Sequence, residues 1–193
     1  MNFRELAHSA VAEHRACQCV EELSALCGLL PNPLRNTLEI GVGDDNGTMW
    51  LWKQISERAL GVDIKPECRD RDPKHVICAD SQDPSTVDLV KALFDGEPID
   101  FLFIDGAHEY AFAKSDYELY GPLVRPGGII AFHDINEKSP DPICVGQFWK
   151  DLEQQVGTMR LVAQRPGARN PLGIGVVVGP GPWGWDEREG WPF

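Results

Sequence analysis

The segment Ile99-Asp100-Phe101-Leu102-Phe103-Ile104-Asp105-Gly106-Ala107-His108 is a short apolar run that leads directly into polar side chains. A second segment, Gly128-Ile129-Ile130-Ala131-Phe132-His133-Asp134, is built in the same way. Each run has the length and composition of a strand buried on both faces of a parallel sheet. Because ligands of open α/β sheets bind beyond the carboxyl ends of such strands, the two segments predict one crevice that holds carboxylates and imidazoles.

Strand patterns alternate with helical patterns on both sides of these segments. The alternation predicts an α/β fold with a parallel, doubly wound sheet. Two closing strands, at 159–163 and 174–178, follow each other without a helix and predict one antiparallel strand. The other expected strands cover 37–43, 60–63, 75–80, 99–104 and 128–132, with a turn at 126–128, and the expected helices cover 3–30 (one or two helices), 48–59, 84–95, 110–123 and 145–156.

The chain of 193 residues is suited to one domain. We divide it into an N-terminal helical cap (1–33), a Rossmann-like core (34–178) and a tail rich in Trp, Pro and Gly (179–193). The cap and the loop at 136–145 are expected to cover the substrate. The tail carries Trp183, Trp185 and Trp191, and the sequence leaves open a lid, a contact in a homo-oligomer, or packing on the domain's own surface.

Composition argues against several classes of partner. The chain has 30 acidic and 18 basic residues and a net charge of -12, which disfavours nucleic acid and anionic membranes. It shows no signal-peptide pattern and no apolar stretch near the ~20 residues that span a bilayer, so we expect a cytoplasmic protein with reduced cysteines. Cys17 and Cys19, two apart on an expected helix, would point in different directions, which disfavours a zinc site there.

The segment Glu39-Ile40-Gly41-Val42-Gly43 lies at an expected strand-to-helix turn. Glycines at such a turn let the backbone approach a ligand closely, although a tight connection without a ligand has the same composition. The glycine spacing is not that of a dinucleotide fingerprint. Glu39 would repel a pyrophosphate but would accept hydrogen bonds from a cationic ligand. A nicotinamide-dependent oxidoreductase is therefore the less favoured alternative.

Polar groups also end the next two expected strands. Asp63 lies about 20 residues after the glycine turn, where an acid receives ribose hydroxyls. The segment Asp80-Ser81-Gln82 follows the third strand and offers groups that can read an adenine edge. This series indicates a nucleoside pocket without a phosphate requirement, and S-adenosylmethionine (SAM) fits it.

Over about residues 36–178 the chain resembles class I SAM-dependent methyltransferases. The resemblance implies a seven-stranded sheet of order 3-2-1-4-5-7-6 with strand 7 antiparallel. Residues 104–108 and 132–135 resemble methyltransferase family 24, the group that includes cephalosporin-hydroxylase-like and macrolide-sugar O-methyltransferases, and residues 79–83 are similar to catechol O-methyltransferases. The resemblance assigns cofactor binding to Glu39, Gly41, Gly43, Asp63, Ile64, Asp80, Ser81 and Asp105.

The resemblance to metal-dependent catechol-type enzymes also implies a catalytic site. It assigns a divalent metal to Asp105, His133 and Asp134. His133 stands where that group usually has Asp, and an imidazole shifts the preference from Mg²⁺ towards Mn²⁺, Fe²⁺ or Zn²⁺. His108 follows Asp105 at the offset where these enzymes carry a general base. The catalytic candidates are therefore His108, Asp105 and His133.

The expected function is methyl transfer from SAM to a hydroxyl of a small molecule, either a sugar or other natural product or a catechol-like phenol. Nitrogen acceptors stay open, and so does a noncatalytic SAM-binding or interaction protein. Each site residue also has a purely structural alternative. Asp105 can cap the following helix, Asp134 can bond loop backbone, His133 can orient Asp134, and His108 can be a surface side chain without chemistry.

Overall fold

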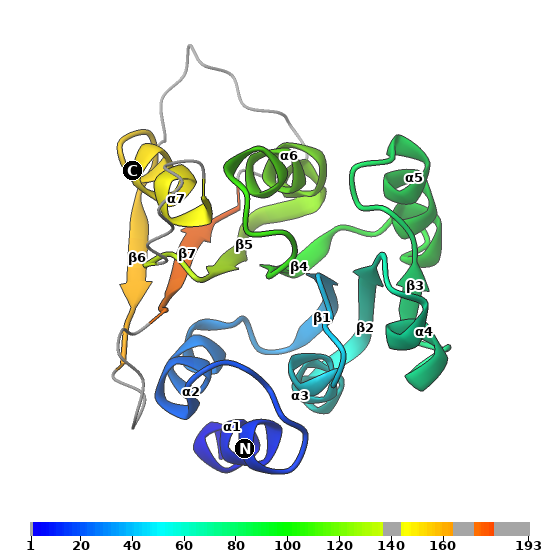
Figure 1. Ribbon diagram of the computed structural model, residues 1–193, viewed down its shortest axis with the longest axis horizontal. Coiled ribbons are helices and arrows are strands. Elements are labelled where there is room, and N and C mark those ends of the chain that lie inside the picture. The colour runs from blue at the N-terminus through cyan, green and yellow to red at the C-terminus, as the bar shows by residue number, and fades with distance from the viewer. Residues whose placement is uncertain (1, 137–143, 164–171, 180–193) are drawn as a thin grey trace.

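The computed structural model describes residues 2–136, 144–163 and 172–179. Its centre is a seven-stranded sheet of order β3-β2-β1-β4-β5-β7-β6 (Figure 1). Neighbouring strands are parallel, except that β7 pairs antiparallel with β5 and with β6. The expected strand order and the antiparallel strand are confirmed. The strands are β1 (Leu34–Ile40), β2 (Ser56–Asp63), β3 (Val76–Cys78), β4 (Ile99–Ile104), β5 (Val124–His133), β6 (Thr158–Leu161) and β7 (Ile174–Val178).

Helices lie on both faces of this sheet (Figure 1). One face carries α1 (Phe3–Ala12), α2 (Val20–Leu29) and α3 (Gly47–Ile55). The other carries α5 (Pro84–Leu93), α6 (Tyr110–Tyr120) and α7 (Val145–Glu153), while a short α4 (Pro66–Arg71) and a 3₁₀ helix η1 (Gly121–Leu123) complete the connections. None of the helices in the described ranges is long and apolar enough to cross a membrane.

The two faces of the sheet bury separate apolar clusters, because side chains alternate along each strand. Phe101 and Phe103 of β4 pack against Trp52 of α3, with ring centroids 4.9 and 5.4 Å apart. Phe132 of β5 faces the opposite cluster and lies 5.9 Å from Trp149 of α7. Trp149 is fully buried in this second cluster.

Several element boundaries differ from the expectation. The helix expected over 48–59 ends at Ile55, because Ser56 to Ala59 pair with β1 as the start of β2. A strand partner outweighs the helical propensity of these charged residues. The turn expected at 126–128 lies within β5, where the register with β4 shifts between Ile99 and Phe101. Gly127 has a φ of +73° at this irregularity.

Other differences are smaller. Helix α6 ends at Tyr120 because Pro122 cannot continue the hydrogen-bond ladder, and α7 ends at Glu153. Helix α4 was not expected, although Pro66 at its start is a common helix signal. Residues 137–143 of the expected loop and the three tail tryptophans lie outside the described residues.

The expectation that Cys17 and Cys19 lie on a helix is wrong. Helix α1 ends at Ala12 and α2 begins at Val20, so both cysteines belong to the connection, with Cys19 as the N-cap. Arg15 adopts a left-handed φ of 61°, which helps turn the chain between the two helices. All six cysteines lie in the described part of the chain, and they form no disulfide bond.

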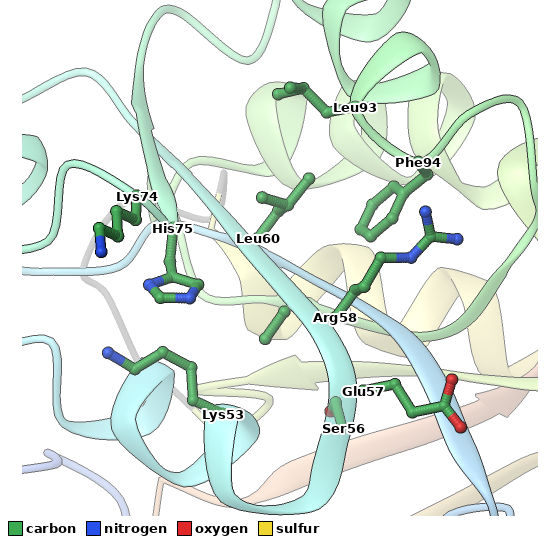
Figure 2. Close-up of a pocket in the computed structure, with 10 residues that line it drawn as sticks. Lys53, Ser56, Glu57, Arg58, Leu60, Lys74, His75, Leu93 and Phe94 are labelled. Atoms are coloured by element: carbon green, nitrogen blue, oxygen red, sulfur yellow. The ribbon is translucent and has the colours of Figure 1, made fainter.

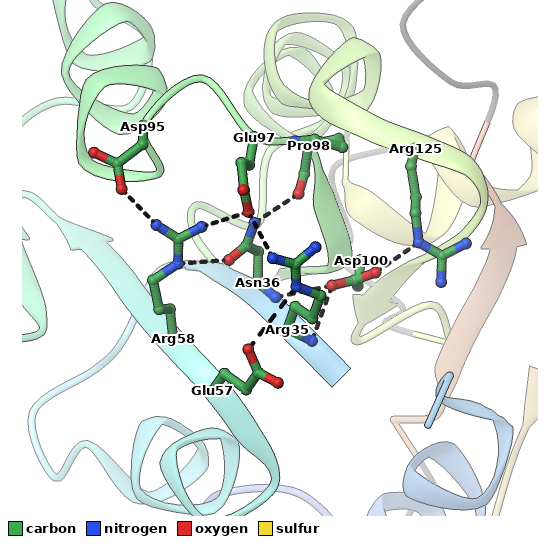
Figure 3. A network of polar contacts seen from close by, with 9 residues as sticks. All are labelled: Arg35, Asn36, Glu57, Arg58, Asp95, Glu97, Pro98, Asp100 and Arg125. Carbon is green, nitrogen blue, oxygen red and sulfur yellow. Dashed lines mark hydrogen bonds and ion pairs between the residues drawn. The ribbon is translucent and has the colours of Figure 1, made fainter. Parts of the chain in front are cut away.

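A polar network ties the strands together at the amino edge of the sheet (Figure 3). Asp100 Oδ2 accepts hydrogen bonds from the backbone N–H groups of Arg35 and Asn36, at 2.9 and 2.8 Å. Its Oδ1 accepts one from Arg125 Nε at 2.6 Å. Because Asp100 is only 6% exposed, these donors replace the water that its carboxylate loses on folding.

Candidate active site

A cavity of about 490 Å³ opens at the carboxyl edge of β1, β2, β3 and β4. Its volume lies in the range of small-molecule sites. Most of the residues expected to bind the cofactor line it, namely Gly41, Gly43, Asp63, Ile64, Asp80, Ser81 and Asp105. The ends of four neighbouring parallel strands therefore deliver these residues to one place, as the fold predicts.

The glycine turn after β1 is needed for two different reasons. Gly41 has a φ of +83°, and a Cβ there would lie 2.3 Å from the backbone oxygen of Asp105. Gly43 has a φ of +72°, but a Cβ there would meet nothing within 4 Å. The first glycine permits close approach of the β1 and β4 ends, and the second leaves open space on the cavity side.

The two acids nearest this turn have different surroundings. Asp63 Oδ2 accepts a hydrogen bond from Gly43 N at 3.0 Å, and its Oδ1 accepts one from Lys65 N at 2.8 Å. Glu39 is fully buried below the turn, accepts a hydrogen bond from Thr48 Oγ1 and does not line the cavity. Burial raises the pKa of Glu39 well above its ordinary value.

The far end of the cavity is polar and includes a residue that the sequence reasoning missed. Asp116, on α6, is 1% exposed yet contributes to the cavity lining. Gln82 Nε2 donates a hydrogen bond to Asp116 Oδ1 at 2.7 Å. Burial raises the pKa of Asp116 to about 6, against the opposing effect of hydrogen bonds from Ser81 and Gln82.

The ends of β4 and β5 bring the expected catalytic groups together. Ligand atoms of Asp105, His108 and Asp134 lie within 4.8 Å of one another. His108 Nε2 is 3.3 Å from Asp134 Oδ2, and the His108 side chain is about half exposed. The crevice with carboxylates and imidazoles that the two segments predict is therefore present.

His133 lies beside this group and not within it. Its Nδ1 is 3.2 Å from Asp105 Oδ1 and 3.1 Å from Asp134 Oδ1, and the residue is 5% exposed. Burial opposes a charge on this imidazole, but the two carboxylates outweigh burial and raise the pKa of His133 well above its ordinary value. Among the described residues, the group whose ligand atoms lie close enough together to hold an ion consists of Asp105, His108 and Asp134, whereas the expectation named His133 in the place of His108.

A divalent cation fits the chemistry of this group. Two carboxylates and one imidazole are a donor set that suits Mn²⁺, Fe²⁺ or Zn²⁺ better than Mg²⁺, which prefers oxygen alone. Asp134 Oδ1 is buried and makes no aligned hydrogen bond among the described residues. His133 is placed to hydrogen-bond ligating carboxylates, as neighbours of metal ligands commonly do.

Gln18 was missed by the sequence reasoning although it reaches this group from the cap. Its Nε2 donates to Asp105 Oδ2 at 2.5 Å, from the connection between α1 and α2. The residue is 2% exposed, and its Oε1 has no hydrogen-bond partner in the described ranges. A glutamine in a connecting segment carries no sequence signal of such a contact.

A second cavity, of about 260 Å³, lies near the amino end of β2 (Figure 2). Figure 2 shows Lys53, Lys74 and His75 on one side of it and Arg58 beside Phe94 on the other. Arg58 already pairs with Asp95 and Glu97, at 2.8 Å each. Asp72 contacts both Lys53 and His75. Most of the basic groups here are thus neutralised by the protein itself.

A protein-family model described as a methyltransferase domain (Methyltransf_24) matches residues 38–135, about half of the chain. The chain belongs to this methyltransferase family. The matched range contains the glycine turn and every strand end that lines the larger cavity. The cap that supplies Gln18 lies outside it.

Two curated proteins illustrate how far the sequence likeness of this chain extends. Demethylmacrocin O-methyltransferase of Streptomyces fradiae is 27% identical over 107 residues, which cover 51% of this chain and 27% of that protein. An uncharacterized protein, y4gI, of Sinorhizobium fredii is 31% identical over 94 residues, which cover 48% of this chain and 9% of that protein. The chain therefore matches only a minor part of each relative.

Solved structures share the fold of this chain. The MycE methyltransferase of mycinamycin biosynthesis, in complex with Mg, S-adenosylhomocysteine (SAH) and mycinamycin VI, has a TM-score of 0.67 at 19% identity, over 100% of this chain and 57% of that one. An O-methyltransferase from Bacillus cereus in complex with SAH has a TM-score of 0.61 at 20% identity, over 92% and 90% of the two chains. At these identities the likeness establishes the sheet architecture.

Proposed function

We propose that this chain binds SAM in the larger cavity and transfers its methyl group to a hydroxyl of a small molecule. The observation that carries the proposal is the meeting of two sites at one edge of the sheet. A nucleoside-sized cavity ends at Asp105, and Asp105 is also a member of the acid and imidazole group. Donor and acceptor would therefore meet at this residue.

The donor side is assigned to the strand ends. Asp63, held by two backbone N–H groups, would receive the ribose hydroxyls. Gly41 and Gly43 would let the amino-acid end of SAM lie against the backbone, and Asp80, Ser81 and Ile64 would surround the base. Glu39 would act from below the turn, through its contact with Thr48, and not as a lining residue. SAM supplies an electrophilic methyl group when it is bound.

The acceptor side is assigned to His108. Methyl transfer to oxygen needs an in-line nucleophile and usually a base that removes its proton. His108 is about half exposed at the group's outer side, where an acceptor hydroxyl can reach it. Asp134, 3.3 Å away, would orient the ring and offset the positive charge that the base gains.

Without a cation, His108 would act as this base. In a second arrangement Asp105, His108 and Asp134 would hold a divalent cation, which would polarise the acceptor oxygen in place of the base, because a ligating imidazole has no lone pair left to accept a proton. The elements β4, α6 and β5 lie next to one another (Figure 1), and their ends hold the backbone of Asp105, His108 and Asp134, respectively. Acceptors with vicinal hydroxyls, such as sugars and catechol-like phenols, suit such a group best. The similarity to demethylmacrocin O-methyltransferase and to the MycE methyltransferase of mycinamycin biosynthesis favours a natural-product hydroxyl as the first class to test.

An acceptor screen tests the proposal. Sugars, macrolide glycosides and catechols are incubated with SAM, and methylated product is detected by mass, with and without a chelator. For an acceptor that is turned over, His108→Ala should lower the rate by about 10²–10⁴, the usual contribution of a general base. The control His8→Ala removes an exposed imidazole from α1 and should leave the rate unchanged.

Two outcomes would overturn parts of the proposal. An unchanged rate in His108→Ala would remove the base assignment. Full turnover after exhaustive chelation would remove the cation. A noncatalytic SAM-binding protein would instead bind SAH normally and methylate no member of the screen.

A further inference from the structure

The Gln82 side chain in the larger cavity has an orientation that its neighbours determine. Its Nε2 donates to Asp116 Oδ1 at 2.7 Å and to Ser81 Oγ at 3.2 Å. Both hydrogen bonds that this amide makes with described residues therefore use its nitrogen. Within the described ranges no hydrogen bond uses Gln82 Oε1, and the residue lines the cavity.

The chemistry of Asp116 explains this choice. An amide has a donor end and an acceptor end that are nearly equal in shape, so its orientation depends on the groups around it. An ionised carboxylate can only accept, and it therefore selects the nitrogen end of a neighbouring amide. Because Asp116 is 1% exposed on α6, water does not compete for this contact. The acceptor end, Oε1, is left for a ligand.

From this geometry we infer that Asp116 is a positioning residue for Gln82 that makes the cavity selective for a purine with an exocyclic amino group. The inference rests on the proposed function, in which the cavity holds the nucleoside of SAM. Adenine presents a 6-amino donor to an acceptor such as Oε1. The 6-oxo purine hypoxanthine presents a carbonyl oxygen instead, and two acceptors would then face each other.

The size of the expected discrimination follows from the cost of an unmatched polar group. Leaving a buried acceptor without a donor weakens binding by on the order of tenfold to a hundredfold. A site built to bond an amino or hydroxyl group rejects an analogue that lacks it more strongly than a hydrophobic pocket does. The wild-type chain should therefore bind SAH more tightly than S-inosylhomocysteine, the 6-oxo analogue, by such a factor.

Asp116→Asn tests the role of the carboxylate. An asparagine offers both a donor and an acceptor, so either orientation of the Gln82 amide is satisfied. Calorimetric titration of this variant should give affinities for SAH and S-inosylhomocysteine within about threefold of each other. Glu118→Gln is the matched control, because it removes one exposed negative charge from the same helix and should keep the wild-type ratio.

A second variant separates positioning from a general structural effect. In Gln82→Ala the discriminating oxygen is gone, so the ratio of the two affinities should fall, and adding Asp116→Asn should not change it further. Thermal unfolding of each variant shows that the chain is folded.

The possible failures are distinguishable. If the wild-type chain does not bind SAH, the proposed function is contradicted and this inference with it. If wild type binds both ligands equally, or if folded Asp116→Asn or Gln82→Ala keeps the wild-type ratio, the inference is overturned while the proposed function stands.

Discussion

Burial of the single carboxyl group of Asp116 gives the protein a pH-dependent stability. The pKa of this group rises from 3.8 to about 6 in the folded chain. The folded state therefore binds more protons than the unfolded state between these values, and stability falls as pH rises through this window. By linkage the loss is about 3 kcal/mol, complete near pH 7.

Urea unfolding of wild type and Asp116→Asn at several pH values measures this effect. The asparagine does not titrate, so the variant should gain stability relative to wild type as pH rises from about 4 to 7. A difference in unfolding free energy that stays constant over this range would contradict the assignment.

If Asp105 serves the proposed methyl transfer, Gln18 would act on that reaction through its hydrogen bond to Asp105, and its removal should affect turnover more than binding. Without the hydrogen bond at 2.5 Å, Asp105 loses the donor that orients one of its oxygens. Gln18→Ala should lower kcat by about 10- to 100-fold, the usual effect of losing a partner of a site carboxylate. Steady-state kinetics and SAH titration check this, with exposed Gln54→Ala as control. Equal kcat values for Gln18→Ala and wild type would refute the role.

At the scale of single residues, the sequence predicts some members of the candidate site and gives no sign of others. Asp105, His108, His133 and Asp134 come together because they follow the ends of two adjacent strands, which sequence patterns reveal. The contact between Gln18 and Asp105 joins residues 87 positions apart, and it depends on how the cap packs on the core. Asp116 looked like one more polar helix residue, because nothing in a single sequence shows that it faces a cavity.

At the scale of structural elements, the glycine turn after β1 predicts different effects for alanine at its two glycines. Gly41→Ala would place a Cβ 2.3 Å from the backbone of Asp105, so the chain should lose several kcal/mol or fail to fold. Gly43→Ala meets no atom within 4 Å and should cost only about 1–2 kcal/mol of left-handed strain, but it should weaken SAH binding.

Chemical denaturation and SAH titration of both variants test this contrast. Gly28→Ala is the control, because this glycine lies within α2 with open space around it and alanine should add about 0.5–1 kcal/mol of stability. Equal destabilisation by the two turn substitutions would contradict the different roles of these glycines.

Sequence patterns predict which helices and strands form better than they predict where each one begins and ends. Residues 56–59 have helical propensity but form the start of β2, because β1 begins at Leu34 and pairs with Ser56. The long, strongly patterned strands β4 and β5 were predicted closely at their carboxyl ends. Local propensity sets the secondary structure of a segment where no neighbouring strand competes for it, and strand pairing sets it where one does.

At the scale of the whole molecule, a network that stabilises the fold and the cavity proposed to bind SAM lie at opposite edges of the sheet. The polar network around Asp100 lies at the amino edge, and the larger cavity lies at the carboxyl edge. Asp100→Ala leaves buried donors unpaired and should reduce the free energy of unfolding by about 2–4 kcal/mol. The SAH affinity of the folded variant should be unchanged.

Urea unfolding and calorimetry measure the two effects independently. Glu57→Ala is the control from the exposed margin of the same network, where its contact with Arg35 is 3.9 Å long and should contribute under about 0.5 kcal/mol. A loss of SAH affinity in folded Asp100→Ala would show that the two edges are coupled.

The central claim is that the larger cavity is a SAM site. Its most direct test is calorimetric titration of the wild-type chain with SAH and, in parallel, with NAD⁺. Saturable binding of one SAH per chain, with no binding of NAD⁺, is the predicted result. Failure to bind SAH, or binding of NAD⁺ in its place, would contradict the account.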